Sequence, residues 1–336
     1  MKNNQLSTTD KPQIIHIEED RAGQRIDNFL LASFHGVPKS RVYSMLRKGE
    51  VRVNKGRVKA HYRLQAGDAV RIPPVRQSEP AQVGQPGSNV LSLIDAGILV
   101  ENKGFLVINK PSGLAVHGGS GLSYGMIEAL RQLRPEAPYL ELVHRLDRDT
   151  SGCLIIAKKR SMLRALHRLL RGEGGQVQKR YFALVKGRWE GAERRVDAPL
   201  RKNTLRSGER MVTVSEDGKA ALSLFRPVTI YQDSTLVEVR LMTGRTHQIR
   251  VHAASIGHPL AGDEKYGDAE FNRLMKERGL KRLFLHAHSL KFPLPESEEK
   301  FSVSAPLAPE LEKVLANLEI SSQDKLKQWE ANEESV

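Results

Sequence analysis

The chain has 336 residues, of which 39% are hydrophobic and 27% charged, a composition typical of a folded protein with a large core. Lysine and arginine outnumber aspartate and glutamate by 53 to 39, which gives a formal net charge of +14. This excess favours a polyanionic partner, most often nucleic acid. The single cysteine, Cys153, excludes an internal disulfide and the multi-cysteine zinc modules, and it suits a reducing cytoplasm.

Membrane and secretion signals are missing from the sequence pattern. No apolar run is long enough to span a bilayer, and the N-terminal residues lack the apolar core of a signal peptide. We therefore expect a cytoplasmic protein with no membrane partner.

Positive charge is concentrated near the start of the chain. Residues 21–76 contain 13 lysines and arginines but only 3 acidic residues, a local net charge of +10. Within this block, the apolar spacing of residues 25–31 predicts a short helix. Ser40 is a candidate N-cap for a second helix, which Gly49 would end after Lys48.

Short strands follow the two helices in this basic block. Apolar and polar residues alternate over residues 51–58, which predicts a hairpin, and residues 69–72 form another candidate strand. An apolar run at residues 14–17 is a further candidate. Two short helices followed by a small sheet indicate a compact α/β domain near the lower size limit for independent folding.

The basic block resembles the S4-type RNA-binding domain. The matching segments are Arg25-Ile26-Asp27, Ser40-Arg41, Leu46-Arg47-Lys48-Gly49, Val51-Arg52-Val53-Asn54 and Gly67-Asp68. The resemblance implies docking on structured RNA, where cationic side chains on one helix and an adjoining hairpin meet phosphates. The side chains implied in docking are Arg41, Arg47, Lys48, Arg52 and Lys55. A solvated basic face without an RNA partner is the alternative.

A segment rich in proline, glycine, glutamine and serine follows the basic block and has the composition of a linker. We therefore divide the chain into five parts. They are a flexible N-terminus (1–18), the S4-like domain (19–76), a linker (77–90), a second and larger domain (91–318) and a polar tail (319–336).

The second domain alternates short strands and helices. The expected strands are 97–100, 105–108, 139–143, 153–157, 178–186, 236–241, 283–290 and 301–304. The expected helices are 125–133, 161–171 capped by Ser161, one that starts at Thr243 or Thr246 and ends by Gly257, and 309–318. Residues 190–220 are charged and irregular, with a possible hairpin.

A charged loop lies between two of these strands, in the run His144-Arg145-Leu146-Asp147-Arg148-Asp149. One interpretation is a solvated turn, because Asp149, Thr150, Ser151 and Gly152 are typical capping and turn residues. The other is a catalytic site, since a carboxylate held between two core strands can be positioned and tuned by its surroundings.

Several classes of chemistry are disfavoured by spacing. The available histidines do not form the His-Glu-x-x-His pattern of a metal site, and no glycine-rich loop has the nucleotide-binding spacing. No serine or cysteine lies in a nucleophile elbow. We therefore expect no metal and no cofactor. A single aspartate beside arginines remains, and a neighbouring cation favours its ionised form, which suits chemistry at the glycosidic bond of a nucleoside.

At this point the sequence resembles the RluA family of pseudouridine synthases. The successive motifs are Asn109-Lys110-Pro111-x-Gly113, His144-Arg145-Leu146-Asp147 with Thr150-Ser151-Gly152, Lys179-Arg180-Tyr181, and Gly244-Arg245-Thr246-His247-Gln248-Ile249-Arg250. The resemblance covers residues 97–305. It implies an α+β fold with a mixed, largely antiparallel central sheet and flanking helices. It also implies an isomerase that converts uridines of 23S ribosomal RNA, or of a large-subunit precursor, to pseudouridine.

The resemblance also implies roles for individual residues. Asp147 is the catalytic aspartate, and Arg250 pairs with it. Tyr181 stacks on the target base and helps to remove the C5 proton. Arg145 enters the RNA stack where the uridine has left, and this offsets part of the few kcal/mol that flipping a base costs.

A non-catalytic alternative fits the composition equally well. An RNA chaperone or ribosome-assembly factor would need the basic charge and the S4-like domain. It would not need Asp147, Tyr181 and Arg250 together, and this intact set favours the enzyme. We expect the protein to act as a monomer.

Overall fold

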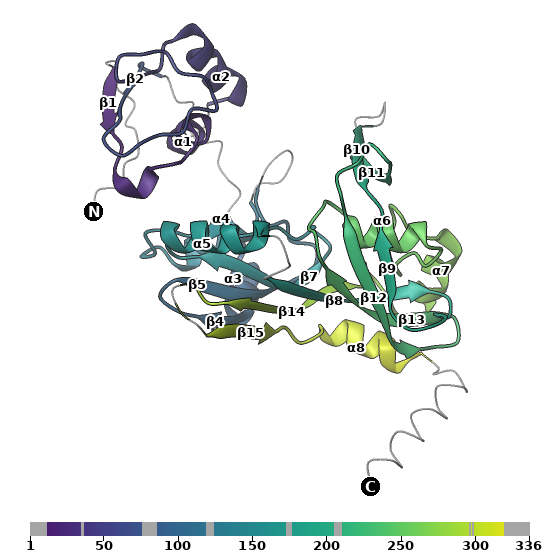
Figure 1. Ribbon diagram of the computed structural model, residues 1–336. Helices are drawn as coiled ribbons and strands as arrows, with labels where there is room; N and C mark the ends of the chain where they lie inside the picture. The colour runs from purple at the N-terminus through teal and green to yellow at the C-terminus, as the bar shows by residue number, and fades with distance from the viewer. Residues whose placement is uncertain are drawn as a thin grey trace. The chain divides into compact units, whose positions relative to one another are not determined.

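The computed structural model describes residues 12–34, 37–75, 86–118, 124–172, 177–204, 210–295, 297 and 299–318. The chain divides into two units, residues 1–84 and 85–336 (Figure 1). The expected tail at 319–336 and most of the expected linker lie outside the described residues.

The N-terminal unit packs two helices against a three-stranded antiparallel sheet of order β1-β3-β2. Its elements are β1 (Gln13–His16), the 3-10 helix η1 (Glu19–Arg21), α1 (Ile26–Ser33), α2 (Lys39–Lys48), β2 (Arg52–Val53) and β3 (Ala69–Ile72). The run at 14–17 does form a strand, and Ile17 is buried in the core of this unit. The expectation of a flexible segment reaching residue 18 was therefore wrong at this end, because pairing with β3 orders β1.

Two local details of this unit differ from the sequence prediction. Helix α2 begins at Lys39 after Pro38, so Ser40 lies inside the first turn and is not the N-cap. Gly49 ends the helix as expected, in the left-handed conformation. The predicted hairpin is reduced to a tight turn closed by a single bridge between Val53 and Gly56, and the strand partner of β2 is β3.

The larger unit is built on one ten-stranded sheet. Its path is β4-β5-β7-β14-β8-β13-β12-β9, with β15 paired to β14 and β6 paired to β7. Only the β7–β14 pairing is parallel, so the predicted mixed, largely antiparallel sheet is confirmed. The strands are β4 (Ile98–Glu101), β5 (Phe105–Lys110), β6 (Glu141–Leu142), β7 (Ser151–Ala157), β8 (Gln178–Lys186), β9 (Arg194–Asp197), β12 (Leu222–Ile230), β13 (Ser234–Leu241), β14 (Leu285–Pro293) and β15 (Lys300–Ser304).

Helices cover both faces of this sheet. Helix α4 packs on the face formed by Leu154 and Ile156 of β7, and α5 packs on the opposite face, formed by Cys153 and Ile155. The helices are α3 (Ser88–Ala96), α4 (Met126–Leu133), α5 (Arg160–Arg171), α6 (Gln248–Ser255), α7 (Ala269–Glu277) and α8 (Pro309–Ala316). A separate hairpin of β10 (Leu200–Thr204) and β11 (Arg210–Val214) projects from the unit (Figure 1). The sequence prediction missed α3, β12 and α7, and it overextended the strand that became β6. The expected linker at 77–90 was wrong at its end, because α3 begins at Ser88.

The middle strands are buried on both faces, which explains their continuous apolar runs. On β7, Leu154 and Ile156 belong to one core, while Cys153 and Ile155 belong to the core on the opposite face. Burial raises the pKa of the Cys153 thiol to about 12, so it is an unreactive core residue. Strand β7 is thus held by packing on both faces, and the charged loop is attached to its first residue, Ser151.

Candidate active site

The charged loop, residues 143–150, joins β6 to β7 and is called the aspartate loop below. It closes in a turn in which the Thr150 N–H donates to the carbonyl of Asp147 at 3.2 Å. Gly152 follows with φ +109°, and a Cβ there would collide with the backbone of Ala287, so only glycine fits. Ser151 Oγ lies 2.9 Å from His286 Nδ1 on β14. These contacts fix the loop to the parallel strand pair at the centre of the sheet.

Lys110 fastens the other side of the aspartate loop. Its fully buried ammonium group donates to the carbonyls of Pro111 and Leu114 at 2.8 Å and of Arg148 at 2.9 Å. Burial lowers the pKa of Lys110 to about 7, but three carbonyl acceptors match the three N–H groups of the protonated form. Lys110 therefore ties the Lys-Pro-x-Gly segment to the aspartate loop.

Asp149 acts differently from the expected capping residue. Its carboxylate pairs with the side chain of Arg148 at 3.2 Å, and both groups are exposed. Its backbone carbonyl accepts a hydrogen bond from Ser112 Oγ at 2.7 Å. The turn is thus held mainly by partners from residues 110–113, because the close approach of that segment replaces side-chain capping.

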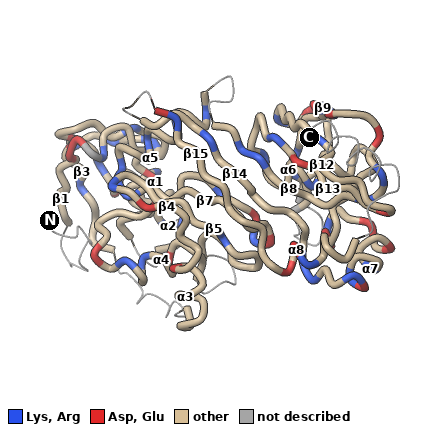
Figure 2. Tube along the Cα trace, turned by 90° about the horizontal axis from the view of Figure 1, so that it is seen from below, with Lys and Arg blue, Asp and Glu red and all other residues tan. Residues whose placement is uncertain are grey.

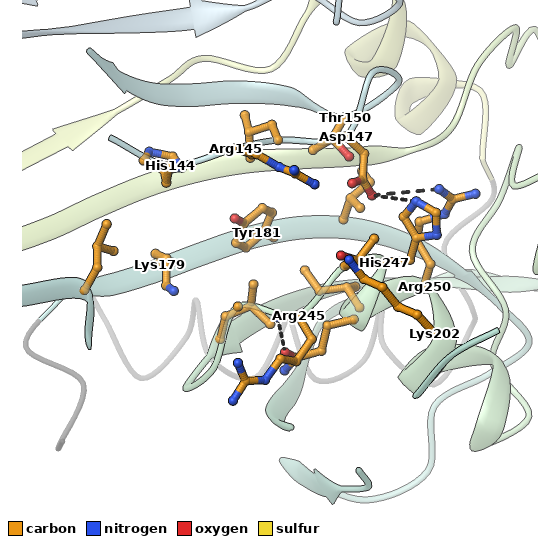
Figure 3. A pocket seen from close by; sticks show the side chains of 18 residues that line it. His144, Arg145, Asp147, Thr150, Lys179, Tyr181, Lys202, Arg245, His247 and Arg250 are labelled. Atoms are coloured by element: carbon orange, nitrogen blue, oxygen red, sulfur yellow. Dashed lines mark hydrogen bonds and ion pairs between the residues drawn. The ribbon is translucent and has the colours of Figure 1, made fainter. Parts of the chain in front are cut away.

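Of the two carboxylates in the aspartate loop, that of Asp147 faces the start of helix α6, where His247 and Arg250 lie. Its Oδ2 lies 3.8 Å from Arg250 Nη1 and 3.8 Å from His247 Nε2 (Figure 3). The Asp147 side chain is 27% exposed, so a ligand can reach it. The expected pairing of Arg250 with Asp147 is present, as a long ion pair.

A second carboxylate, which sequence reasoning missed, holds Arg250 in place. Asp263 accepts from Arg250 Nε and Nη2, each at 2.7 Å, and the Asp263 side chain is 1% exposed. Burial would raise the pKa of Asp263, but these bonds and the backbone N–H groups of Lys265 and Tyr266 lower it. The bidentate pair uses two guanidinium nitrogens and leaves Nη1 directed toward Asp147.

The start of α6 differs from the prediction that Thr243 or Thr246 would cap it. His247 is the N-cap and adopts the left-handed conformation, with φ 54°. The Gln248 side chain accepts from Thr243 Oγ1 and from the Arg245 N–H, which closes the preceding loop on itself. This tight entry brings His247 and Arg250 to the same carboxylate.

His247 is oriented by a tyrosine from another loop. Tyr266 Oη lies 2.8 Å from His247 Nδ1 and accepts the Val212 N–H at 3.0 Å. With that backbone donor in place, the hydroxyl can donate its own hydrogen to Nδ1, which leaves the Nε2–H directed toward Asp147. Tyr266 thereby connects strand β11 to His247, and His247 in turn contacts Asp147 of the aspartate loop.

Tyr181 and Lys179 project from β8 into a cavity of about 480 Å³ beside Asp147 (Figure 3). They are two residues apart on the strand and therefore share a face. Tyr181 is 8% exposed, and its burial, with the nearby Asp147, raises the pKa of its phenol. Burial lowers the pKa of Lys179. An aromatic ring, a cation and a carboxylate thus surround a space that suits a flat polar ligand.

His144 also lines this cavity but serves the fold. Its Nε2 accepts the Ile155 N–H at 3.1 Å, and burial, assisted by the charge of Lys179, lowers the pKa of His144 to about 3. His144 is therefore neutral at physiological pH, and it fixes the aspartate loop to β7.

Known proteins resemble this chain over nearly its whole length. A ribosomal large subunit pseudouridine synthase C from Pasteurella multocida is 56% identical over 307 residues, covering 91% of this chain and 94% of that protein. The protein of that name from Escherichia coli K12 is 55% identical over 314 residues, covering 92% and 98%. The RNA pseudouridylate synthase family model matches residues 104–255.

The chain belongs to the RNA pseudouridylate synthase family.

The chain is accordingly an isomerase, and the S4 domain family model matches its residues 24–70. Among solved structures, human RNA pseudouridylate synthase domain containing 4 aligns with a TM-score of 0.57 at 27% identity. The alignment covers 70% of this chain and 98% of that one. The pseudouridine synthase fold and the S4 domain are thus shown, and the non-catalytic alternative gains no support.

Arg145 of this synthase is exposed and lines two neighbouring cavities. The first is the cavity beside Tyr181, and the second, of about 720 Å³, lies across Asp147. Asp147, His247 and Arg250 border both. The structure therefore places Arg145 at the divide between the two spaces.

In the S4 domain, the five predicted docking residues differ in whether they already form contacts within the protein. Arg41 pairs with Glu50 at 2.8 Å, and Arg52 Nε donates to the carbonyl of Gly49 at 3.3 Å. Arg47, Lys48 and Lys55 are exposed, and Lys55 follows Asn54 in the left-handed turn. The domain thus presents mostly uncommitted positive charge.

The described part of the chain has neither a metal-type cluster nor a spanning helix. No group of three or more histidine, cysteine, aspartate or glutamate side chains within it could hold a metal ion. No helix in the same ranges combines the length and apolar character needed to cross a membrane.

Proposed function

We propose that this chain isomerises uridines of 23S ribosomal RNA, or of a large-subunit precursor, as a cytoplasmic monomer. The relatives named above act, by their names, on the ribosomal large subunit. The observation that carries the proposal is the position of Asp147, beside a cavity lined by Tyr181 and within 3.8 Å of Arg250.

Asp147 is the proposed catalytic residue. A single ionised carboxylate beside the flipped nucleoside can act as nucleophile or as base at the sugar or the uracil. Arg250 supplies the neighbouring positive charge, and its bidentate bonds to Asp263 keep that charge in place. No redox or group-transfer step occurs when uracil leaves through N1 and rejoins through C5, so the reaction needs no cofactor.

Tyr181 is the proposed platform for the target base. Its ring lies in the wall of the cavity, where a uracil can stack on it. The raised pKa of Tyr181 disfavours the phenolate that C5 deprotonation would require. Stacking is therefore the better supported role, and assistance at C5 is a separate proposal that depends on the hydroxyl.

Arg145 is the proposed occupant of the gap that the flipped uridine leaves in the RNA. It is exposed and lines both cavities that Asp147 borders, so it can contact the RNA beside the flipped nucleotide. A planar guanidinium can stack between bases and donate hydrogen bonds to them.

The S4 domain is proposed to dock the enzyme on folded RNA through Arg41, Arg47, Lys48, Arg52 and Lys55. The exposed members supply sequence-independent contacts to phosphates, which strengthen at low salt. The division into an S4 domain that begins at β1, a linker that ends before α3 at Ser88 and a catalytic domain that extends to residue 318 belongs to this proposal.

Mapping pseudouridines in 23S ribosomal RNA tests the function. Cells that lack the gene should lose pseudouridine at specific positions, and a plasmid copy should restore it. A copy with Asp147→Asn should fail to restore it while being expressed at the same level. An unchanged pseudouridine map in the deletion strain would contradict the proposed substrate.

A further inference from the structure

Helix α5 carries a basic face that the proposed catalytic mechanism does not use. Residues 158–171 contain six lysines and arginines and no acidic residue. Arg164, Arg168 and Arg171 are exposed, and their spacing of four and three residues places them on one side of the helix. Blue segments mark the tube at α5 in Figure 2.

The opposite face of α5 is fixed to the sheet. Leu166 is buried, and Leu163 and Leu170 pack against the same core. The ring of His167 bonds the carbonyl of Val143 through Nε2 at 3.0 Å. Val143 immediately precedes His144, so the helix is anchored on the segment that leads into the aspartate loop.

The arginines of this face are available for a partner. Neither Arg164 nor Arg168 forms an ion pair within the described ranges of the chain, whereas many other arginines there do. Arg171 donates through Nε to the carbonyl of His167, and this bond leaves its Nη groups unused. Burial of the helix is complete without these three side chains, so the fold does not explain them.

The basic face also adjoins the active site. Leu170 lines the cavity that contains Tyr181 and Lys179, and Arg171 is the next residue. Successive turns of the helix therefore lead away from the cavity, from Arg171 through Arg168 to Arg164. Their rise of about 6 Å from Arg164 to Arg168 suits contacts with successive phosphates.

We propose that Arg164, Arg168 and Arg171 form a docking track for the RNA backbone that flanks the target uridine. The track holds the strand as it leaves the cavity, while Arg145 and Asp147 act on the flipped nucleotide. The inference rests on the proposed function and deepens it by assigning a second RNA contact in the catalytic domain, independent of the S4 domain. An anionic lipid surface or an acidic protein would use the same charges and is an outcome of the test.

The test compares two matched charge reversals. Arg164→Glu/Arg168→Glu alters the track, while Arg273→Glu/Lys276→Glu makes the same charge change at exposed positions of α7. Affinity for an unmodified 23S ribosomal RNA transcript that contains a target uridine is measured by anisotropy between about 50 mM and 200 mM salt. The conversion rate is measured in the same samples.

The track variant should bind about tenfold or more weakly, and its plot of log affinity against log salt should be shallower by about 2. The value of kcat/KM should fall by a similar factor. The α7 variant should show a much smaller change in slope. Arg164→Lys/Arg168→Lys should retain the wild-type slope, which separates loss of charge from loss of fold.

The outcomes separate this inference from the function on which it rests. If wild type converts uridine and the track variant matches the α7 control in affinity and slope, the docking track is wrong and the function stands. If wild type converts no uridine in any transcript, the proposed function fails first. If the track variant keeps its RNA affinity but loses binding to anionic vesicles or to an acidic protein, the partner assigned here is wrong.

Discussion

The S4 domain and the active-site cleft use the same residue types in opposite ways. In the S4 domain, Arg47, Lys48 and Lys55 are exposed and uncommitted. In the cleft, Arg250 is bound to a buried carboxylate and Lys110 to three carbonyls. An exposed charged side chain is screened by salt and can contact a polyanion in many orientations. A buried charged side chain is held in one orientation by its partners. Binding and catalysis should therefore respond separately to mutation.

Among variants that keep Asp147, Arg250→Met should have the largest effect. It removes the cation beside Asp147 and leaves Asp263 as an unpaired buried charge. We expect kcat to fall by about a thousandfold and the free energy of unfolding to fall by about 3–5 kcal/mol. Single-turnover kinetics and denaturant unfolding measure the two effects.

A second variant separates these effects of Arg250. Arg250→Met/Asp263→Asn removes the buried charge yet keeps an oxygen for the N–H groups of Lys265 and Tyr266. It should recover much of the lost stability and none of the lost rate. Recovery of both would mean that Arg250 serves the fold alone.

The next largest effect should come from Tyr181→Phe. The ring remains for stacking, so RNA affinity should stay within about threefold of wild type. If the hydroxyl assists at C5, kcat should fall by about a hundredfold or more, the usual contribution of a positioned proton-transfer group. Release of tritium from C5-labelled uridine measures this step. A rate near wild type would leave stacking as the only role, and Tyr181→Leu should then still be impaired.

Arg47→Glu/Lys48→Glu in the S4 domain should have a smaller effect, expressed in binding. Two lost phosphate contacts should lower the salt slope by about 2 and weaken affinity by roughly tenfold at moderate salt. The difference from wild type should shrink as salt rises. A salt slope equal to that of wild type would remove the S4 domain from RNA docking.

The smallest effect near neutral pH concerns His144. Its pKa is lowered from 6.5 to about 3 in the folded protein, so between these values the unfolded chain binds a proton that the folded chain does not. Stability should therefore decline as pH falls below about 6.5, by up to about 1.4 kcal/mol per pH unit from this group. His144→Gln keeps an acceptor for the Ile155 N–H and should flatten this decline. An unchanged pH profile of unfolding would contradict the assignment.

The sequence predicted those elements that are determined by neighbouring residues, such as apolar runs and turns. The strands β5, β7, β8, β13 and β14 were recognisable because their apolar runs reflect burial on one or both faces. The aspartate loop was recognisable because two turn residues and a glycine follow its charges. The family motifs then brought Asp147, Tyr181 and Arg250 together, and the structure places all three at one cavity.

Long-range partnerships were not predictable in the same way. Asp263 is one of 39 acidic residues, and nothing in its own segment marks it as the partner of Arg250. The left-handed His247 depends on the Gln248 side chain closing the preceding loop, which no propensity scale records. The motif position of Lys110 was a signal, but its three carbonyl partners appear only when two distant segments meet.

The most direct test of the account is the single-turnover rate of Asp147→Asn, with its RNA affinity measured in the same buffer. The substitution keeps the size of the side chain and removes the charge. We predict that uridine isomerisation is abolished while affinity stays within about tenfold, a change of ~1.4 kcal/mol or less. A rate near wild type, or a loss of RNA binding that accounts for the loss of rate, would contradict the division between a catalytic carboxylate in the cleft and exposed docking charge.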